Sequence, residues 1–249
     1  MRKMFLMLGM LGSLFSLQAQ SLQSAGVTQL PVGAAPTLQP AVTLSAPLAV
    51  LPANKQDMKS LFLAMPDSIV PLLTEVNRAD CVDFLASDMK AEVKNRFGKP
   101  SELKQLTDHY LCLQLTSRST LAMKLLPVND SVQVICAVRT VEGPVADSRI
   151  NFYTTGWQPL DPTDFLALPT AADAYLPADS VPGDADPSIR LKADMDLWRA
   201  ELSAATDQLT WTYTTPQYLV KDDREKLQAW LKQTPLVYVW KEGRFVRQP

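Results

Sequence analysis

Four short segments with alternating apolar residues, all within Leu106–Thr155, constrain the fold of this chain more than any other feature. In the first of them Leu111, Leu113 and Leu115 fall on one face, because successive side chains of a strand point to opposite faces. The separators are short and rich in turn residues such as serine, asparagine and glycine. They permit antiparallel hairpins but leave no room for parallel crossovers, so the stretch predicts a meander. The four predicted strands are 109–115, 120–126, 132–139 and 148–154.

The N-terminus has the pattern of a secretory signal peptide over residues 1–20. Two basic residues precede an apolar run, Met4–Leu17, and Gln18-Ala19-Gln20 supplies a small residue at the expected cleavage region. The apolar run is shorter than the roughly 20 residues that span a membrane. We therefore expect a periplasmic or secreted protein with no membrane span after cleavage; an uncleaved anchor is the alternative. No cysteine lies near the cleavage region, which argues against a lipoprotein anchor.

Residues 21–56 are predicted to be a linker. The chain carries no charged residue between Lys3 and Lys55, and prolines interrupt this segment every few residues. It has neither a helical nor a strand period, which favours an extended, polyproline-like state. Two roles stay open: a spacer between the domain and a surface or partner, and a tail without a role of its own.

Three helices are expected before the meander. The first spans Asp57–Met65 and is stopped by Pro66, and the second spans Asp67–Leu73. The third opens at Asn77 and continues through Val93, with apolar residues at helical spacing. Each helix has an apolar stripe to bury, and the sheet that follows is the available partner.

A long acidic connection, 156–188, follows the meander. It is rich in proline and aspartate, and no basic residue occurs between Arg149 and Arg190. A connection of this length is either a packed crossover or a functional lid. The packed crossover is favoured, and the lid stays open as the alternative.

The C-terminal part predicts a hairpin, a helix and a second hairpin. Alternation over Ile189–Leu197 and over Leu209–Tyr213 predicts two strands joined through Ser203–Asp207, although a helix over 194–205 is the alternative. The last two elements are a helix over 222–232, with acids first and bases last as suits its dipole, and a hairpin over 236–246. Residues 57–249 therefore predict a single α+β domain, an antiparallel meander sheet with N-terminal helices packed on it and a hairpin-helix-hairpin section at the C-terminus.

Several stretches of the chain resemble a known family. They include Leu63-Ala-Met-Pro-Asp-Ser68, Leu125-Leu-Pro-Val-Asn-Asp-Ser131, Tyr213-Thr-Thr-Pro-Gln-Tyr-Leu219 and Val237-Tyr-Val-Trp240. The chain is similar, from about Leu61 to its C-terminus, to a family of exported proteins from Gram-negative gut bacteria known as domain of unknown function 3256. The resemblance implies an exported, single-domain protein; it implies no reaction and no catalytic residues.

Composition and motifs give little sign of chemistry. The net charge of −2 offers no basic surface for nucleic acid. His109 is the only histidine, and we expect it to be structural or exposed. Cys81, Cys112 and Cys136 have apolar neighbours and are predicted to be buried free thiols, with a Cys81–Cys112 bridge as the alternative. No spacing fits a zinc site and no glycine-rich loop fits a phosphate, so neither metal nor cofactor is expected.

Aromatic and acidic residues of the second half supply the candidate binding residues. Trp198 falls on the polar phase of its predicted strand and is the best candidate for an exposed contact; Trp157 is the second. Asp161 and Asp164 are the candidate carboxylates. The sequence favours a non-catalytic interaction or ligand-binding module whose partner is an envelope protein or a glycan. A carboxylate-based hydrolase using Asp161 and Asp164, and a carbohydrate-binding accessory protein using Trp157 and Trp198, are the alternatives.

Overall fold

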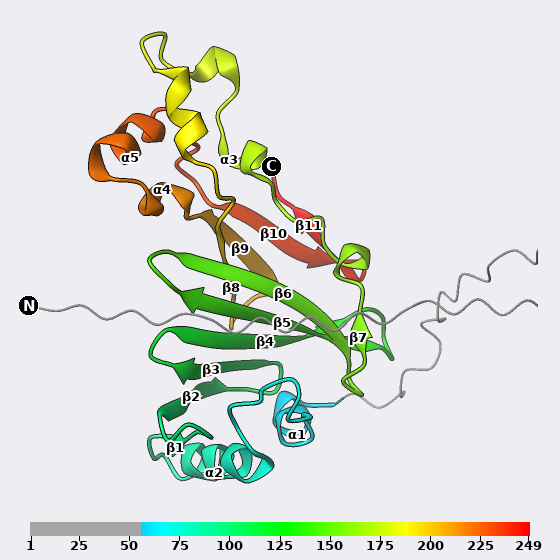
Figure 1. The fold of residues 1–249 in the computed structure, drawn as a ribbon. Coiled ribbons are helices and arrows are strands. Elements are labelled where there is room, and N and C mark those ends of the chain that lie inside the picture. Colours follow the sequence, from blue (N-terminus) through cyan, green and yellow to red (C-terminus); the bar gives the residue numbers. More distant parts are fainter. Residues whose placement is uncertain (1–55) are drawn as a thin grey trace, which may run out of the picture. The chain divides into compact units, whose positions relative to one another are not determined.

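The computed structural model describes residues 56–249, which form two antiparallel sheets and several short helices (Figure 1). The larger sheet has seven strands in the order β1-β2-β3-β4-β5-β6-β7, which is also their order along the chain. The predicted meander is therefore confirmed. The signal peptide and all but the last residue of the predicted linker lie outside the described residues. The strands of this sheet are β1 Glu92–Lys94, β2 Pro100–Leu106, β3 Tyr110–Thr116, β4 Ser119–Pro127, β5 Gln133–Glu142, β6 Ala146–Thr154 and β7 Pro159–Leu160.

The smaller sheet has four strands in the order β11-β10-β9-β8. Its strands are β8 Trp198–Leu202, β9 Gln208–Tyr213, β10 Leu236–Lys241 and β11 Arg244–Arg247. The helices are α1 Met58–Leu63, α2 Glu75–Ala86, α3 Ala171–Ala174, α4 Thr215–Tyr218 and α5 Lys221–Gln228, with 3₁₀ turns at Pro162–Asp164, Ala178–Ser180 and Pro187–Lys192. The α+β class and the hairpin-helix-hairpin order of the C-terminal section are confirmed.

Both faces of the larger sheet are buried. Leu111, Leu113 and Leu115 point to one face, where they pack with residues of α1 and α2. The opposite face carries alternate residues such as Val134 and Cys136, which pack with the aromatic residues of the smaller sheet. This arrangement explains why six consecutive residues of β5, from Gln133 to Val138, are all buried. The sequence predicts the helical layer, and the structure adds the second sheet.

Side chains of the larger sheet form hydrogen bonds with backbone groups on the β8 edge of the smaller sheet. Asp147 accepts a hydrogen bond from the backbone N–H of Trp198 (3.3 Å), and the Ser148 hydroxyl accepts one from Ala200 N–H (2.9 Å). Thr214 Oγ1 donates to the Ala146 carbonyl oxygen (2.7 Å). An edge strand exposes unpaired backbone groups, and these contacts satisfy part of the β8 edge while joining the two sheets.

A buried lysine forms a second link between the sheets. Lys124 of β4 is 3 % exposed and its ammonium donates to the carbonyl oxygens of Ser203 (2.7 Å) and Thr206 (2.6 Å). The Asp207 carboxylate lies 3.3 Å from the same nitrogen. The two carbonyl oxygens accept hydrogen bonds from the ammonium group, and the half-exposed Asp207 carboxylate balances its charge. The β8–β9 turn, Ser203–Asp207, is thereby held on the larger sheet.

Two of the three predicted helices before the sheet differ in the structure. The third ends at Ala86 rather than Val93, because Ser87 caps it, Asp88 takes a positive φ of 54° and residues 92–94 form β1. The predicted helix over 67–73 is instead a series of turns. The Arg78 guanidinium fixes these turns by donating to the carbonyl oxygens of Met65 (2.6 Å) and Leu73 (3.1 Å) and to Asp67.

The strand predicted over 189–197 is wrong. Pro187–Lys192 is a 3₁₀ turn that Asp186 caps by accepting from Ser188 N–H (2.8 Å), and the strand begins only at Trp198. Period-two alternation does not separate a strand from an irregular segment in which every second residue is apolar. The connecting turn over 203–207 and the closing hairpin are confirmed, and the helix predicted over 222–232 ends earlier, at Gln228.

The three cysteines are free, as predicted. Cys81 belongs to the helical side of the larger sheet, whereas Cys112 packs with the core on the opposite side. A bridge between them would have to cross the sheet. Burial raises the pKa of the Cys81 thiol to about 11, so this group stays protonated and unreactive at neutral pH.

Candidate functional site

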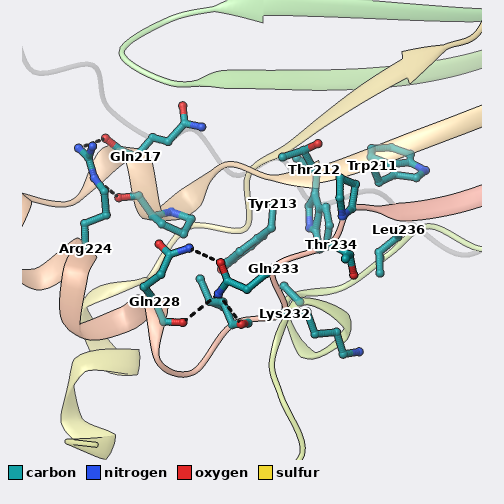
Figure 2. Close-up of a pocket in the computed structure, with 15 residues that line it drawn as sticks. Trp211, Thr212, Tyr213, Gln217, Arg224, Gln228, Lys232, Gln233, Thr234 and Leu236 are labelled. Atoms are coloured by element: carbon teal, nitrogen blue, oxygen red, sulfur yellow. Dashed lines mark hydrogen bonds between the residues drawn. The ribbon is translucent and has the colours of Figure 1, made fainter. Parts of the chain in front are cut away.

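A pocket of about 240 Å³ opens where β9 ends, between α4, α5 and the segment that leads into β10 (Figure 2). Trp211 and Tyr213 of β9 share one face of the strand and line one side. The amide side chains of Gln217, Gln228 and Gln233 line the other. We call this site the amide pocket.

The helical wall of the amide pocket is held by one arginine. Arg224 of α5 donates to the carbonyl oxygens of Pro216 (3.1 Å), Gln217 (3.0 Å) and Leu219 (3.1 Å). The last carbonyl groups of a helix have no partner within the helix, and Arg224 supplies one to the end of α4. Its guanidinium therefore fixes α4 against α5 and positions Gln217 at the rim.

The amide groups are partly hydrogen-bonded to one another. Gln228 Nε2 donates to Gln233 Oε1 (3.1 Å), and Gln233 Nε2 donates to the carbonyl oxygens of Leu231 (3.0 Å) and Gln228 (3.3 Å) (Figure 2). The side chains of Gln217, Thr212 and Thr234 make no hydrogen bond within residues 56–249. These groups can therefore donate to or accept from a ligand.

Two buried polar atoms on lining residues have no hydrogen-bond partner in the described part of the chain: Trp211 Nε1 and the Tyr213 hydroxyl. Burial raises the pKa of Tyr213 to about 12, so its hydroxyl is a neutral donor at neutral pH. A buried polar group without a partner costs free energy, about 1–3 kcal/mol.

The lining of the amide pocket offers hydrogen bonds and aromatic contact. Its two cations are already engaged, because Arg224 donates to three carbonyl oxygens and Lys232 Nζ donates to the Asp173 carbonyl oxygen (2.9 Å). None of the residues that line the pocket is an aspartate, glutamate, histidine, serine or cysteine. The pocket thus presents amide groups, hydroxyl groups and aromatic rings, with no carboxylate or imidazole in its lining.

A second pocket, of about 560 Å³, lies between β6 and the connection that follows it. Trp198 and Trp211 line this pocket as well as the amide pocket. Ser148 and Ile150 contribute from β6, and Leu168 contributes from the connection. We call this second site the β6 groove.

The structure places the predicted site residues apart from one another. The expectation that Trp198 is exposed is wrong: it is 6 % exposed, because β8 begins at this residue and turns it toward the core. Trp157 is 7 % exposed and packs with the helical side of the larger sheet, opposite Trp198. The two indoles therefore form no common surface.

The predicted carboxylates, Asp161 and Asp164, lie at an exposed 3₁₀ turn. Asp161 caps the turn by accepting from the backbone N–H (2.9 Å) and hydroxyl (2.7 Å) of Thr163. These hydrogen bonds lower the pKa of Asp161. Neither carboxylate lines the amide pocket or the β6 groove, although Pro162, between them, lines the groove.

Sequence reasoning missed the glutamines of the amide pocket. Neutral amides in loops and on short helices have no spacing that marks a site, so only the fold identifies them. Of the residues that the structure describes, no three His, Cys, Asp or Glu side chains are arranged to hold a metal ion. Within 56–249, no helix is both long and apolar enough to cross a bilayer.

Comparison with known proteins supports a family assignment. A family model described as "Protein of unknown function (DUF3256)" matches residues 50–245. The solved structure of a domain of an uncharacterized protein from Porphyromonas gingivalis W83 is 32 % identical, with a TM-score of 0.69; the match covers 78 % of this chain and 100 % of that one. No curated protein matches the chain.

Proposed function

We propose that this chain, which belongs to the family of proteins of unknown function DUF3256, is a non-catalytic ligand-binding domain of an exported protein. The amide pocket is the proposed binding site. One observation carries this proposal: the pocket is lined by Thr212, Gln217 and Thr234, whose hydroxyl and amide side chains make no hydrogen bond within residues 56–249.

The chemistry of the lining selects a small, uncharged ligand that bears hydroxyl and amide groups. A cationic ligand would find no carboxylate in the lining, and the two cations, Arg224 and Lys232, already donate to backbone carbonyl oxygens. A volume of about 240 Å³ lies below the 300–1,000 Å³ typical of sites for drug-sized molecules, so it suits a single small unit. An N-acetylated sugar of an envelope glycan has this size and these groups.

Export is part of the proposal. The signal-peptide pattern over residues 1–20 supports a periplasmic or secreted protein, where envelope glycans are within reach. A cell fractionation that follows the full chain, together with N-terminal sequencing of the product, tests this point. Retention in the cytoplasm with an intact N-terminus would contradict it.

Binding is tested by the thermal unfolding of the full chain in the presence of N-acetylglucosamine. A ligand at 100 times its dissociation constant stabilises the folded state by about 2.7 kcal/mol, which raises the melting temperature measurably. Glucosamine and glucuronate, which add a positive and a negative charge, are the matched ligands. We expect the neutral sugar alone to raise the melting temperature; an equal response to all three would contradict the proposed selectivity.

Variants locate the binding. Gln217→Ala removes an amide at the rim and is expected to weaken binding about tenfold, whereas Gln248→Ala, outside the pocket, leaves binding unchanged. Tyr213→Phe removes a buried hydroxyl without a partner, so we expect it to weaken binding while stability is kept or raised. If both pocket variants bind the sugar as tightly as the wild type, the amide pocket is not the binding site.

A further inference from the structure

β6 keeps a free backbone edge beside the β6 groove. In the antiparallel ladder with β5, Arg149 and Asn151 turn their backbone groups toward β5, and Ser148 and Ile150 turn theirs away. Thr154 of the same strand fixes which residues point outward, because its N–H donates to the Gln158 carbonyl oxygen, away from β5. Ser148 and Ile150 lie an even number of residues from Thr154, so their backbone groups point to the same side. Within residues 56–249 no hydrogen bond uses the backbone N–H or C=O of Ser148 or Ile150.

The neighbouring strands stop short of this edge. β7 pairs with β6 only at Phe152 and Tyr153. β8 meets β6 through the side chains of Asp147 and Ser148 and not through a ladder. The two outward residues thus leave two N–H donors and two C=O acceptors in line, at the spacing of an added strand.

The β6 groove provides the space for such a strand. Its volume is about 560 Å³, and Ser148 and Ile150 themselves line it. Its other walls include Pro162, Leu168 and Pro169 from the connection, and Leu168 is 57 % exposed. An exposed leucine above an unpaired strand edge gives an apolar contact for a side chain of the added strand.

The charge of the groove is acidic. Asp147 and Asp196 line it against the single basic residue Arg149. Asp161 and Asp164 flank Pro162, and the connection contributes no basic residue before Arg190. A partner with positive side chains is therefore complementary to this surface, and an acidic one is not.

We propose that the β6 groove binds an extended peptide segment of a partner protein that carries basic side chains, by addition of a strand to β6 at Ser148 and Ile150. The peptide backbone supplies the hydrogen bonds that these residues lack, and its lysine or arginine side chains lie near Asp147 and Asp196. Trp211 also lines the groove. The β6 groove shares Trp198 and Trp211 with the amide pocket but takes a different class of ligand.

The test uses the ¹⁵N-labelled full chain and the acetylated, amidated peptide Thr-Lys-Val-Lys-Val-Thr. Its counterpart with glutamate in place of both lysines is the matched control. We expect the lysine peptide to bind at least tenfold more tightly than the glutamate peptide at low salt. We further expect the amide protons of Ser148 and Ile150 to exchange at least tenfold more slowly in the complex, while those of Arg149 and Asn151, already bonded to β5, change little.

A protein variant separates charge from fold. Asp147→Asn keeps an oxygen that can accept from Trp198 N–H and removes the negative charge, so we expect the lysine peptide to bind several-fold more weakly. Asp130→Asn makes the same charge change in the β4–β5 turn and should leave the affinity unchanged. Equal affinity for both peptides, no binding of the lysine peptide at millimolar concentration, or binding without protection of Ser148 and Ile150 would each overturn the proposal.

Discussion

At the scale of single residues, two buried cations hold irregular turns in place by donating hydrogen bonds to backbone carbonyl oxygens. Arg78 is 2 % exposed and donates to two carbonyl oxygens of the turns before α2, and Lys124 does the same for the β8–β9 turn. In both cases a charge replaces regular secondary structure as the partner of backbone oxygens. A buried charge without partners costs free energy. We therefore expect that removing either the cation or its acceptors destabilises the fold.

Replacing Lys124 tests this role. Lys124→Met keeps most of the volume but leaves the carbonyl oxygens of Ser203 and Thr206 without their donor, so we expect a loss of about 1–3 kcal/mol in the free energy of unfolding. Urea unfolding measures it. Lys241→Met, at an exposed position of β10, is the control and should change stability by less than about 0.5 kcal/mol. A Lys124 variant as stable as the control would show that the turn needs no such link.

At the scale of elements, aspartates begin the short helices. Asp57, Asp161 and Asp186 each accept a hydrogen bond from a backbone N–H of the turn they precede. At Asp186 the Ser188 hydroxyl donates as well and is the larger contributor. These bonds favour the charged form and lower the pKa of each carboxyl group. A carboxyl group whose pKa is lower in the folded state than in the unfolded state stabilises the fold at any pH above its unfolded-state pKa, 3.8. This stabilisation is lost as the pH falls through the folded-state pKa.

The pH dependence of α1 follows from Asp57. Asp57→Asn retains an oxygen that can cap the helix but no longer titrates, so it should match the wild type in stability near neutral pH. Below pH 3.8 the wild type should lose stability relative to the variant, as Asp57 becomes protonated. Unfolding in urea between pH 2.5 and 6 measures the difference. A constant difference across this range would show that the Asp57 carboxylate has no preference for the folded state.

The elements also show what the sequence could and could not predict. The strands from β3 to β6 were predictable because their alternation is regular and their turns are short. β1 and β2 were not, because Glu92–Lys94 buries one residue and Pro100–Leu106 is polar over much of its length. Trp198 was placed on the wrong phase because the alternation before it belongs to a 3₁₀ turn. The glutamines of the amide pocket carry no local signal at all.

At the scale of the whole described region, the larger sheet is the shared layer between two hydrophobic clusters. One cluster joins it to α1 and α2, and the other joins it to the smaller sheet. Residues of β5 belong to both clusters, with Val134 on one face and Ile135 on the other. Loss of either outer layer therefore exposes a face of the same strands, and we propose that residues 57–249 unfold as a single domain.

Coincident unfolding curves would support that proposal. Trp198, Trp211 and Trp240 lie in the smaller sheet, so tryptophan fluorescence mainly reports that layer, whereas far-ultraviolet circular dichroism reports helices and both sheets. We expect the two signals to change with the same midpoint in urea. A fluorescence transition at clearly lower urea would show instead that the smaller sheet unfolds by itself.

The central claim is that the amide pocket binds a small neutral ligand, and an NMR titration tests it most directly. The ¹⁵N-labelled full chain is titrated with N-acetylglucosamine while the tryptophan indole and glutamine side-chain amide signals are followed. The account predicts shifts at Trp211 Nε1 and at the amides of Gln217 and Gln228, with Trp157, on the far face of the larger sheet, unmoved. Unchanged Trp211 and glutamine signals at saturating sugar, or shifts centred on Trp157, would contradict it.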